Sequence, residues 1–160
     1  MSTNGAFGVV KLEPFDAAED DYRYLRLRAA ELCKKFNDQP FTTSAEERRK
    51  AWNEIVNPGA GMGQTELLDY PQIKGPITID YGLQLLIDPS CFLNRGCFIG
   101  DNPDSPVTIG ANTILGPGVT INSVTHPTDW RERRGRHGPS LAGPVTIGED
   151  CYIGSNVVIL

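Results

Sequence analysis

The sequence IDPSCFLNRGCFIG, residues 87–100, places Ile87, Leu93 and Ile99 at intervals of six. The same interval recurs further along the chain, first in Ile109, Leu115 and Ile121 and then in Ile147, Ile153 and Ile159. An earlier and weaker pair precedes them, Ile73 and Ile79. A period of six is not that of an amphipathic helix, whose apolar residues recur at three and four. It is the period of a β-solenoid repeat.

The positions that flank these aliphatic residues repeat as well. Four residues after each of them the side chain is small: Cys91, Cys97, Thr113, Val119, Thr125, Cys151 and Val157. The residue directly after each aliphatic one often favours turns: Asp88, Asn94, Gly100, Gly110, Gly116, Asn122, Gly148 and Gly154. Three such hexads form one triangular coil with the aliphatic side chains stacked inside. We therefore predict a β-solenoid, a left-handed parallel β-helix of hexapeptide repeats.

The repeat breaks at two places, where loops are expected to leave the coil. The first break, residues 101–106, is short. The second, residues 122–146, contains the sequence SVTHP and a basic run, RERRGRH at 131–137. A long insert in a solenoid normally lies on one face and often carries function. We therefore treat residues 122–146 as the candidate catalytic loop.

Two amphipathic helices are predicted ahead of the repeat, within residues 16–56. Leu25, Ala29, Leu32 and Phe36 share one helix face, while Arg26 and Arg28 fall on other faces. Ser44 and Glu47 have the spacing of a capping box, and Asn57-Pro58-Gly59 ends the second helix. Helices of this size cover a larger unit. The expected organisation is an N-terminal α-helical cap over residues 1–70 and a β-helix over residues 71–160.

The composition indicates one domain that needs neither nucleic acid nor a membrane. The chain has 160 residues with a net charge of −5, so nothing favours a polyanionic partner. No apolar run has the length of a membrane span, and Met1 to Leu12 does not resemble a secretory signal. The expected compartment is the cytoplasm. The four cysteines form no C-x-x-C pair, so we expect buried thiols and no metal.

Residues 20–160 resemble the maltose and galactoside O-acetyltransferases, the hexapeptide-repeat sugar acetyltransferases that include the nodulation acetyltransferases. Four segments carry the resemblance. They are LRLRAAEL with Phe36-Asn37, Asp80-Tyr81-Gly82, Phe92-Leu93-Asn94, and Thr125-His126-Pro127 with the later GPVTIG at 143–148. The hexads are shared by many solenoids, whereas the cap helix together with Thr-His-Pro in a long insert is much more specific.

The resemblance implies an acetyl-CoA-dependent O-acetyltransferase that acts on a sugar-like hydroxyl in a homotrimer. His126 would be the general base for direct transfer, and a neutral imidazole suits that task near neutral pH. Asp16, Asp80 and Asn94 match sugar-site positions of the family, with a one-residue gap at Asp16. Gly154 and Ser155 match the coil that contacts acetyl-CoA. The trimeric carbonic anhydrases share the fold, but they need three histidines on one metal and this chain has two.

The chain also departs from the family pattern. Ser140 stands where many relatives have a carboxylate, and Tyr152 where many have Trp. The basic run is typical of a solvated face, and it would also attract the phosphates of CoA. The chain ends at Leu160 inside a hexad, where relatives continue for several coils. We expect from this a better site for sugar than for acetyl-CoA. The alternative function is a catalytically weak relative that only binds or assembles.

Overall fold

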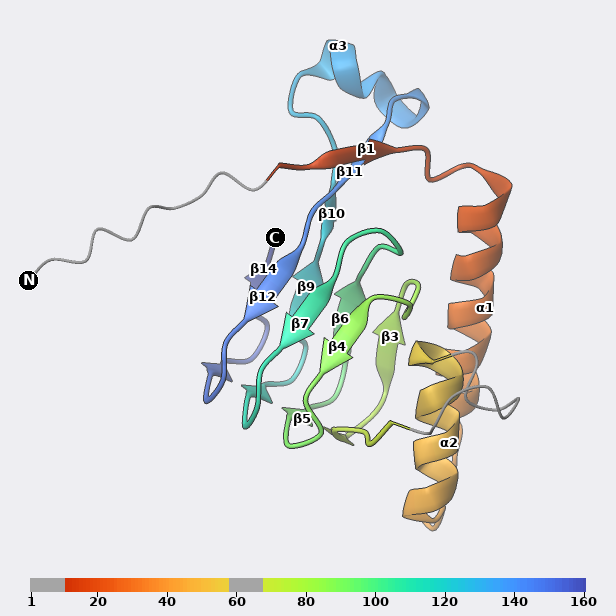
Figure 1. The fold of residues 1–160 in the computed structure, drawn as a ribbon, viewed down its shortest axis with the longest axis vertical. Helices are drawn as coiled ribbons and strands as arrows, with labels where there is room; N and C mark the ends of the chain where they lie inside the picture. Colours follow the sequence, from red (N-terminus) through yellow and green to blue (C-terminus); the bar gives the residue numbers. More distant parts are fainter. Residues whose placement is uncertain (1–10, 58–67) are drawn as a thin grey trace, which may run out of the picture.

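The computed structural model describes residues 11–57 and 68–160. Most of the Met1 to Leu12 segment, and the Pro58-Gly59 helix end, lie outside these residues. In the described part of the chain the parallel strands form three sheets, and consecutive strands belong to each sheet in turn (Figure 1). We call this unit the coil.

The sheets are named here by their strands. The first sheet contains β4 (Leu85–Ile87), β7 (Val107–Ile109) and β12 (Val145–Ile147). The second contains β2 (Gln72–Ile73), β5 (Phe92–Leu93), β8 (Ile114–Leu115) and β13 (Tyr152–Ile153). The third contains β3 (Ile77–Ile79), β6 (Cys97–Gly100), β9 (Thr120–Asn122) and β14 (Val158–Ile159).

The register of these sheets confirms the six-residue pattern. Each aliphatic position in one turn of the coil pairs with its equivalent in the next turn. These positions form three columns: Ile87–Ile109–Ile147, Leu93–Leu115–Ile153 and Ile99–Ile121–Ile159. The middle of each column is at most 1% exposed. Cys91 and Cys97 are also buried in this core, as expected for small interior residues, whereas Cys151, expected there as well, is only partly buried. The stacked side chains are the main apolar area that the coil removes from water.

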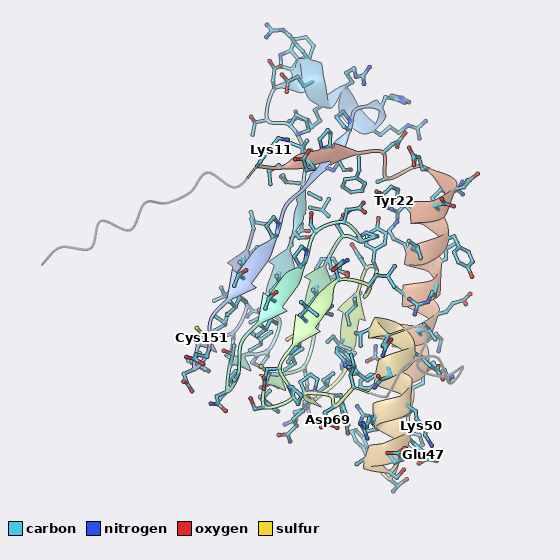
Figure 2. All side chains as sticks on the ribbon, in the orientation of Figure 1. Lys11, Tyr22, Glu47, Lys50, Asp69 and Cys151 are labelled. Atoms are coloured by element: carbon cyan, nitrogen blue, oxygen red, sulfur yellow. The ribbon has the colours of Figure 1, made fainter. Side chains whose placement is uncertain are left out.

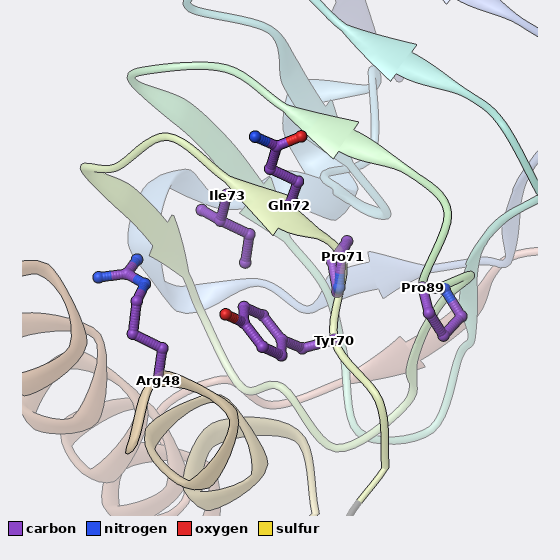
Figure 3. A pocket seen from close by; sticks show the side chains of 6 residues that line it. All are labelled: Arg48, Tyr70, Pro71, Gln72, Ile73 and Pro89. Atoms are coloured by element: carbon purple, nitrogen blue, oxygen red, sulfur yellow. The ribbon is translucent and has the colours of Figure 1, made fainter. Parts of the chain in front are cut away.

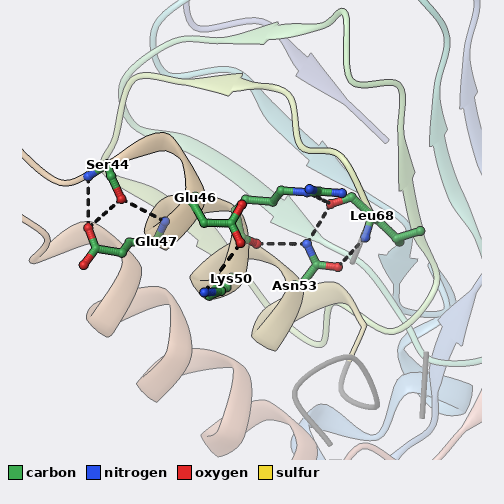
Figure 4. A network of polar contacts seen from close by, with 7 residues as sticks. Ser44, Glu46, Glu47, Lys50, Asn53 and Leu68 are labelled. Atoms are coloured by element: carbon green, nitrogen blue, oxygen red, sulfur yellow. Dashed lines mark hydrogen bonds and ion pairs between the residues drawn. The ribbon is translucent and has the colours of Figure 1, made fainter. Parts of the chain in front are cut away.

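Two helices pack beside the first strands of the coil. They are α1 (Asp20–Asn37) and α2 (Ala45–Val56), and α1 contacts both α2 and β3 (Figure 1). Ala29, Cys33 and Phe36 of α1 are buried. The predicted capping box is present at the start of α2, where Ser44 and Glu47 bond each other's backbone (Figure 4).

Arg26 and Arg28 of α1 make contacts that the helix pattern did not predict. Both side chains are half-buried. Arg28 donates to the carbonyl oxygens of Glu54 and Ile55, which are the free acceptors at the C-terminal end of α2. Burial lowers the pKa of Arg28. A long side chain can cover apolar surface with its stem and still carry its charge to a distant acceptor, which a helical-wheel argument does not see.

The long insert forms a projecting arm that leaves the coil between β9 and β12. It contains β10 (Val124–Thr125), α3 (Trp130–Arg133), a 3₁₀ turn at Gly135–His137, and β11 (Ser140–Ala142). β11 pairs antiparallel with β10 on one side and with β1 (Glu13–Phe15) on the other. Figure 1 shows β1 crossing between the arm and the start of α1.

Thr125 was expected inside the coil, and this expectation is wrong. Its side chain is exposed because the chain turns out of the coil after Asn122 and enters the arm. Tertiary pairing with β11 replaces the next hexad at this point. No helix in residues 11–57 or 68–160 is long and apolar enough to cross a membrane.

Candidate active site

His126 follows directly after β10, where the arm begins. Its ring is exposed, and its Nδ1 lies 3.5 Å from the carbonyl oxygen of Pro139, just before β11. The β10–β11 pairing brings these two segments together. His126 is therefore an imidazole held at the edge of the arm and open to a reactant.

A hollow of about 360 Å³ lies beside Pro139, between the arm and β1. Its lining is Pro14, Phe15, Asp16, Arg134, His137, Gly138 and Pro139. Asp16 matched a family position only with a one-residue gap. In the structure it lies across the hollow from the arm. Mixed apolar and charged linings of this kind are typical of small-molecule sites.

Aromatic and polar contacts fix β1 in this position. The Phe15 ring lies 5.1 Å from the Tyr22 ring of α1, centroid to centroid. The Tyr22 hydroxyl donates to Asp104 Oδ2 at 2.5 Å, and this bond raises the pKa of Tyr22 to about 12. Asp16 itself accepts the Ala18 N–H at 2.8 Å through Oδ1. These contacts place Asp16 before any ligand arrives.

A buried polar cluster lies at the turn between β3 and β4. Asp101 has no exposure to solvent and accepts the backbone N–H groups of Tyr81 and Gly82 at 2.8 and 2.7 Å. Burial raises the pKa of Asp101 to about 6, against the lowering effect of those two hydrogen bonds. The adjacent Asp80 is half-buried, and burial raises its pKa too, although Arg26 opposes the shift.

Arg26 connects this cluster to the segment that carries Asp16. One guanidinium nitrogen donates to the Tyr81 hydroxyl at 2.6 Å and the other to the Ala17 carbonyl at 2.7 Å. Neither Arg26 nor Asp101 was predicted from the sequence as a site residue. No local period marks them, because their partners lie in distant segments of the chain.

The remaining predicted residues lie at a different corner of the coil. The turns from the third sheet to the first carry Asp80, Asp101 and the arm. The turns from the second sheet to the third carry Asn94 after β5 and Gly154-Ser155 after β13. Asn94 uses its Oδ1 to accept the Arg95 N–H at 2.9 Å. One chain therefore brings Asp16, Asp80 and His126 to one corner, and Asn94, Gly154 and Ser155 to another.

A second hollow, of about 340 Å³, lies near the start of α2 and contains none of the predicted residues (Figure 3). Its lining is Arg48, Tyr70, Pro71, Gln72, Ile73 and Pro89. Arg48 is already engaged, because its guanidinium lies 4.4 Å from the centre of the Phe36 ring. Within the described residues, no three His, Cys, Asp or Glu side chains gather into a metal-binding group.

Comparisons with known proteins identify relatives of this chain. Residues 13–59, which run from β1 past the end of α2, match the family model described as the maltose acetyltransferase hexapeptide capping motif. Nodulation protein L of Rhizobium meliloti is 32% identical over 148 residues, which cover 92% of this chain and 74% of that protein. Galactoside O-acetyltransferase of Escherichia coli is 31% identical over 134 residues, or 84% of this chain and 60% of that protein.

Solved structures show the same fold. A maltose O-acetyltransferase from Clostridium difficile superposes with a TM-score of 0.74 at 23% identity, covering 92% of this chain and 72% of that one. A galactoside acetyltransferase in complex with coenzyme A superposes with a TM-score of 0.68 at 25% identity, covering 91% and 66%.

Proposed function

The chain belongs to the family of hexapeptide-repeat acetyltransferases that includes nodulation protein L and galactoside O-acetyltransferase, and from this membership we propose that it moves an acetyl group from acetyl-CoA to a hydroxyl of a sugar-like acceptor. The coil is then the family's left-handed β-helix, residues 71–160, and residues 1–70 are its cap. The observation that carries the proposal is the hollow that Asp16 and the arm line together, whose wall includes Pro139, the residue that His126 contacts.

His126 is the general base of the proposed reaction. Its imidazole accepts the proton of the acceptor hydroxyl while the hydroxyl oxygen attacks the thioester carbonyl of acetyl-CoA. A C–O bond forms, the C–S bond breaks, and the proton passes from His126 to the departing thiolate. An alcohol is a poor nucleophile near neutral pH, so a positioned base contributes about 10²–10⁴-fold. The exposed ring beside Pro139 leaves room for both reactants.

Asp16 and Asp80 belong to the acceptor side. Both lie at the corner of the arm, and Arg26 links their segments through Tyr81 and Ala17. Carboxylates accept hydrogen bonds from sugar hydroxyls without competing with the base for a proton. The hollow's apolar surfaces, from Phe15 and the two prolines, suit the C–H face of a sugar ring.

Asn94, Gly154 and Ser155 complete the site from a neighbouring subunit. They lie at a different corner from His126, so one coil does not bring the two groups together. A homotrimer with cyclic symmetry repeats one heterologous contact three times and sets one corner of each subunit against a different corner of the next. The sugar would then touch Asn94 of one subunit and His126 of another, and acetyl-CoA would contact Gly154-Ser155.

Acetyl-CoA turnover against a panel of sugars tests the proposal. We expect transfer by the native chain, and a loss of about 10²–10⁴-fold in kcat for His126→Ala with little change in the KM for acetyl-CoA. Arg136→Ala is the matched control for kcat, because it changes the same arm outside the lining of the hollow. Accumulation of an acetylated enzyme would contradict direct transfer, and equal losses in both variants would contradict the role of His126.

A further inference from the structure

The arm concentrates positive charge in a chain whose net charge is −5. Two of its arginines are engaged. Arg131 pairs with Asp129 at 3.5 Å, and Arg133 donates to the carbonyl oxygens of Pro127 and Thr128 at 3.1 and 3.2 Å. Within residues 11–57 and 68–160, no hydrogen bond, ion pair or ring contact engages the guanidinium of Arg134 or of Arg136. These two arginines are available to a ligand.

Only one of the two arginines lines the hollow. Arg134 lies there with His137, across from Asp16, whereas Arg136 is not part of the lining. The backbone holds Arg134 in a left-handed turn, with φ 46° and ψ 41°, and its N–H bonds the Trp130 carbonyl. The turn is tight, since a Cβ on Gly138 would overlap the Arg133 carbonyl oxygen. The side chain of Arg134 is thus free while its anchor is well defined.

We propose that Arg134, assisted by His137, forms an anion-binding subsite that selects acceptors carrying a carboxylate, sulfate or phosphate group. The inference rests on the proposed function and adds the class of acceptor. A guanidinium binds a planar or tetrahedral oxyanion through two parallel N–H donors. Asp16 on the opposite wall accepts from the hydroxyls, so an acidic sugar meets both charges with complementary groups.

The acceptor is a better occupant of this subsite than the phosphates of CoA. The hollow adjoins Pro139, whose carbonyl oxygen lies 3.5 Å from the Nδ1 of the proposed base. Asp16 also faces it, and a group with several negative charges would be repelled by that carboxylate more strongly than a single anionic substituent. A sugar with one acidic group and several hydroxyls fits the charges on the two walls.

Matched acceptors test the subsite. The probes are methyl α-glucoside as the neutral sugar, and glucose 1-phosphate, glucose 6-phosphate and glucuronate as the anionic ones. We expect the native chain to prefer at least one anionic probe by about tenfold in kcat/KM, with the preference falling as salt is added. Arg134→Gln should remove that preference by lowering kcat/KM for the anionic probe about tenfold more than for the neutral sugar.

Arg136→Gln is the control, because it removes the same charge from the same arm without touching the hollow. Equal effects of Arg134→Gln and Arg136→Gln would overturn the subsite in favour of the general field of the arm. A higher KM for acetyl-CoA in Arg134→Gln, equal for all acceptors, would overturn it in favour of the donor. So would the absence of any anionic preference in the native chain.

Calorimetric binding of the same four probes separates this inference from the proposed function. If no acceptor is acetylated, the proposed function fails. The subsite is supported if an anionic probe binds the native chain and Arg136→Gln with similar affinity and binds Arg134→Gln about tenfold more weakly. It falls if all three proteins bind the neutral and anionic probes alike.

Discussion

Asp101 holds a carboxyl group where no solvent reaches it, and this single residue determines how the turn beside Asp80 is built. Its two oxygens accept the N–H groups of Tyr81 and Gly82. Gly82 has φ +78°, and a Cβ there would lie 2.8 Å from the Ile55 carbonyl oxygen. Asp101 thus ties a close-packed turn of the coil to the end of α2, and it positions Asp80 without itself touching the hollow.

The raised pKa of Asp101 leads to a prediction about stability and pH. The pKa rises from its usual 3.8 to about 6 on folding, so between these values the folded state holds a proton that the unfolded state has lost. Stability contributed by this proton is complete below pH 3.8 and is lost as the pH rises to about 6. We therefore compare the free energies of unfolding of the native chain and of Asp101→Asn. The stability advantage of the native chain should fall over this pH range by on the order of 3 kcal/mol.

Urea unfolding of both proteins at a series of pH values between 4 and 7.5 measures this difference. Subtracting the variant removes the contribution of other carboxyl groups, such as Glu47, whose pKa is lowered by its bonds to Ser44. A difference that stays constant or grows with pH would show that the carboxyl of Asp101 is ionised in the fold at pH 4.

At the scale of elements, β1 connects the cap to the arm. It pairs with β11 and delivers Asp16 to the hollow, and the Phe15–Tyr22 contact attaches it to α1. A strand of three residues with one partner is weak alone, so its position depends on such side-chain contacts. We therefore expect the position of the arm to depend on the position of β1.

Phe15→Ala tests this coupling. Loss of an aromatic pair worth about 0.5–1.5 kcal/mol should raise the KM for the acceptor by about two- to tenfold, because Asp16 is no longer held in place. The KM for acetyl-CoA should change little, and the amides of β11 should exchange faster with solvent. Leu12→Ala, at an exposed position just before β1, is the control. Unchanged exchange in β11 would mean that the arm is held without β1.

The start of α2 gives a second prediction at this scale. Ser44 and Glu47 form the capping box in Figure 4, with the Glu47 N–H donating to Ser44 Oγ at 3.2 Å. Ser44→Ala should lower the free energy of unfolding by about 1 kcal/mol. Thr42→Ala, in the exposed loop just before the helix, should have an effect within about 0.5 kcal/mol. Thermal or urea unfolding measures both variants. Similar decreases in the free energy of unfolding would show that the capping box does not stabilise the helix specifically.

At the scale of the whole molecule, the proposed site residues are divided between two corners of the coil. Figure 2 shows that side chains cover the coil, the helices and the arm, and the arm stands away from the rest of the fold. His126 and Asn94 occupy different corners, as the sheet order requires. A site that needs both residues is completed only by a second subunit.

Mixed assemblies test this arrangement directly. His126→Ala and Asn94→Ala should each be nearly inactive alone. When the two are co-expressed in equal amounts, a random trimer population should recover about a quarter of native turnover, because each mixed trimer has one site with both native residues. Two tagged copies of the same variant give the control. No recovery in mixed trimers would place both residues in the site of one subunit, and a monomer in solution would exclude a shared site.

The sequence by itself determined what depends on short-range pattern. The three aliphatic columns follow from spacing within each hexad, because every coil repeats the same inward position and the next coil stacks on it. The capping box follows from two residues within one turn. His126 lies in the long break of that pattern, and the resemblance to the sugar acetyltransferases implied its role as the base.

Only the tertiary structure decided how the arm, β1 and the buried cluster fit together. β1 and β11 are too short for a detectable period, and they come from opposite ends of the chain. The sequence pattern placed Arg26 and Arg28 outside the apolar helix face, and only the fold shows that Tyr81 and the end of α2 accept their hydrogen bonds. Asp101 became a buried carboxyl only because two backbone N–H groups of another turn point at it. In each case the partner is remote in sequence, so the energy of the contact exists only in the folded chain.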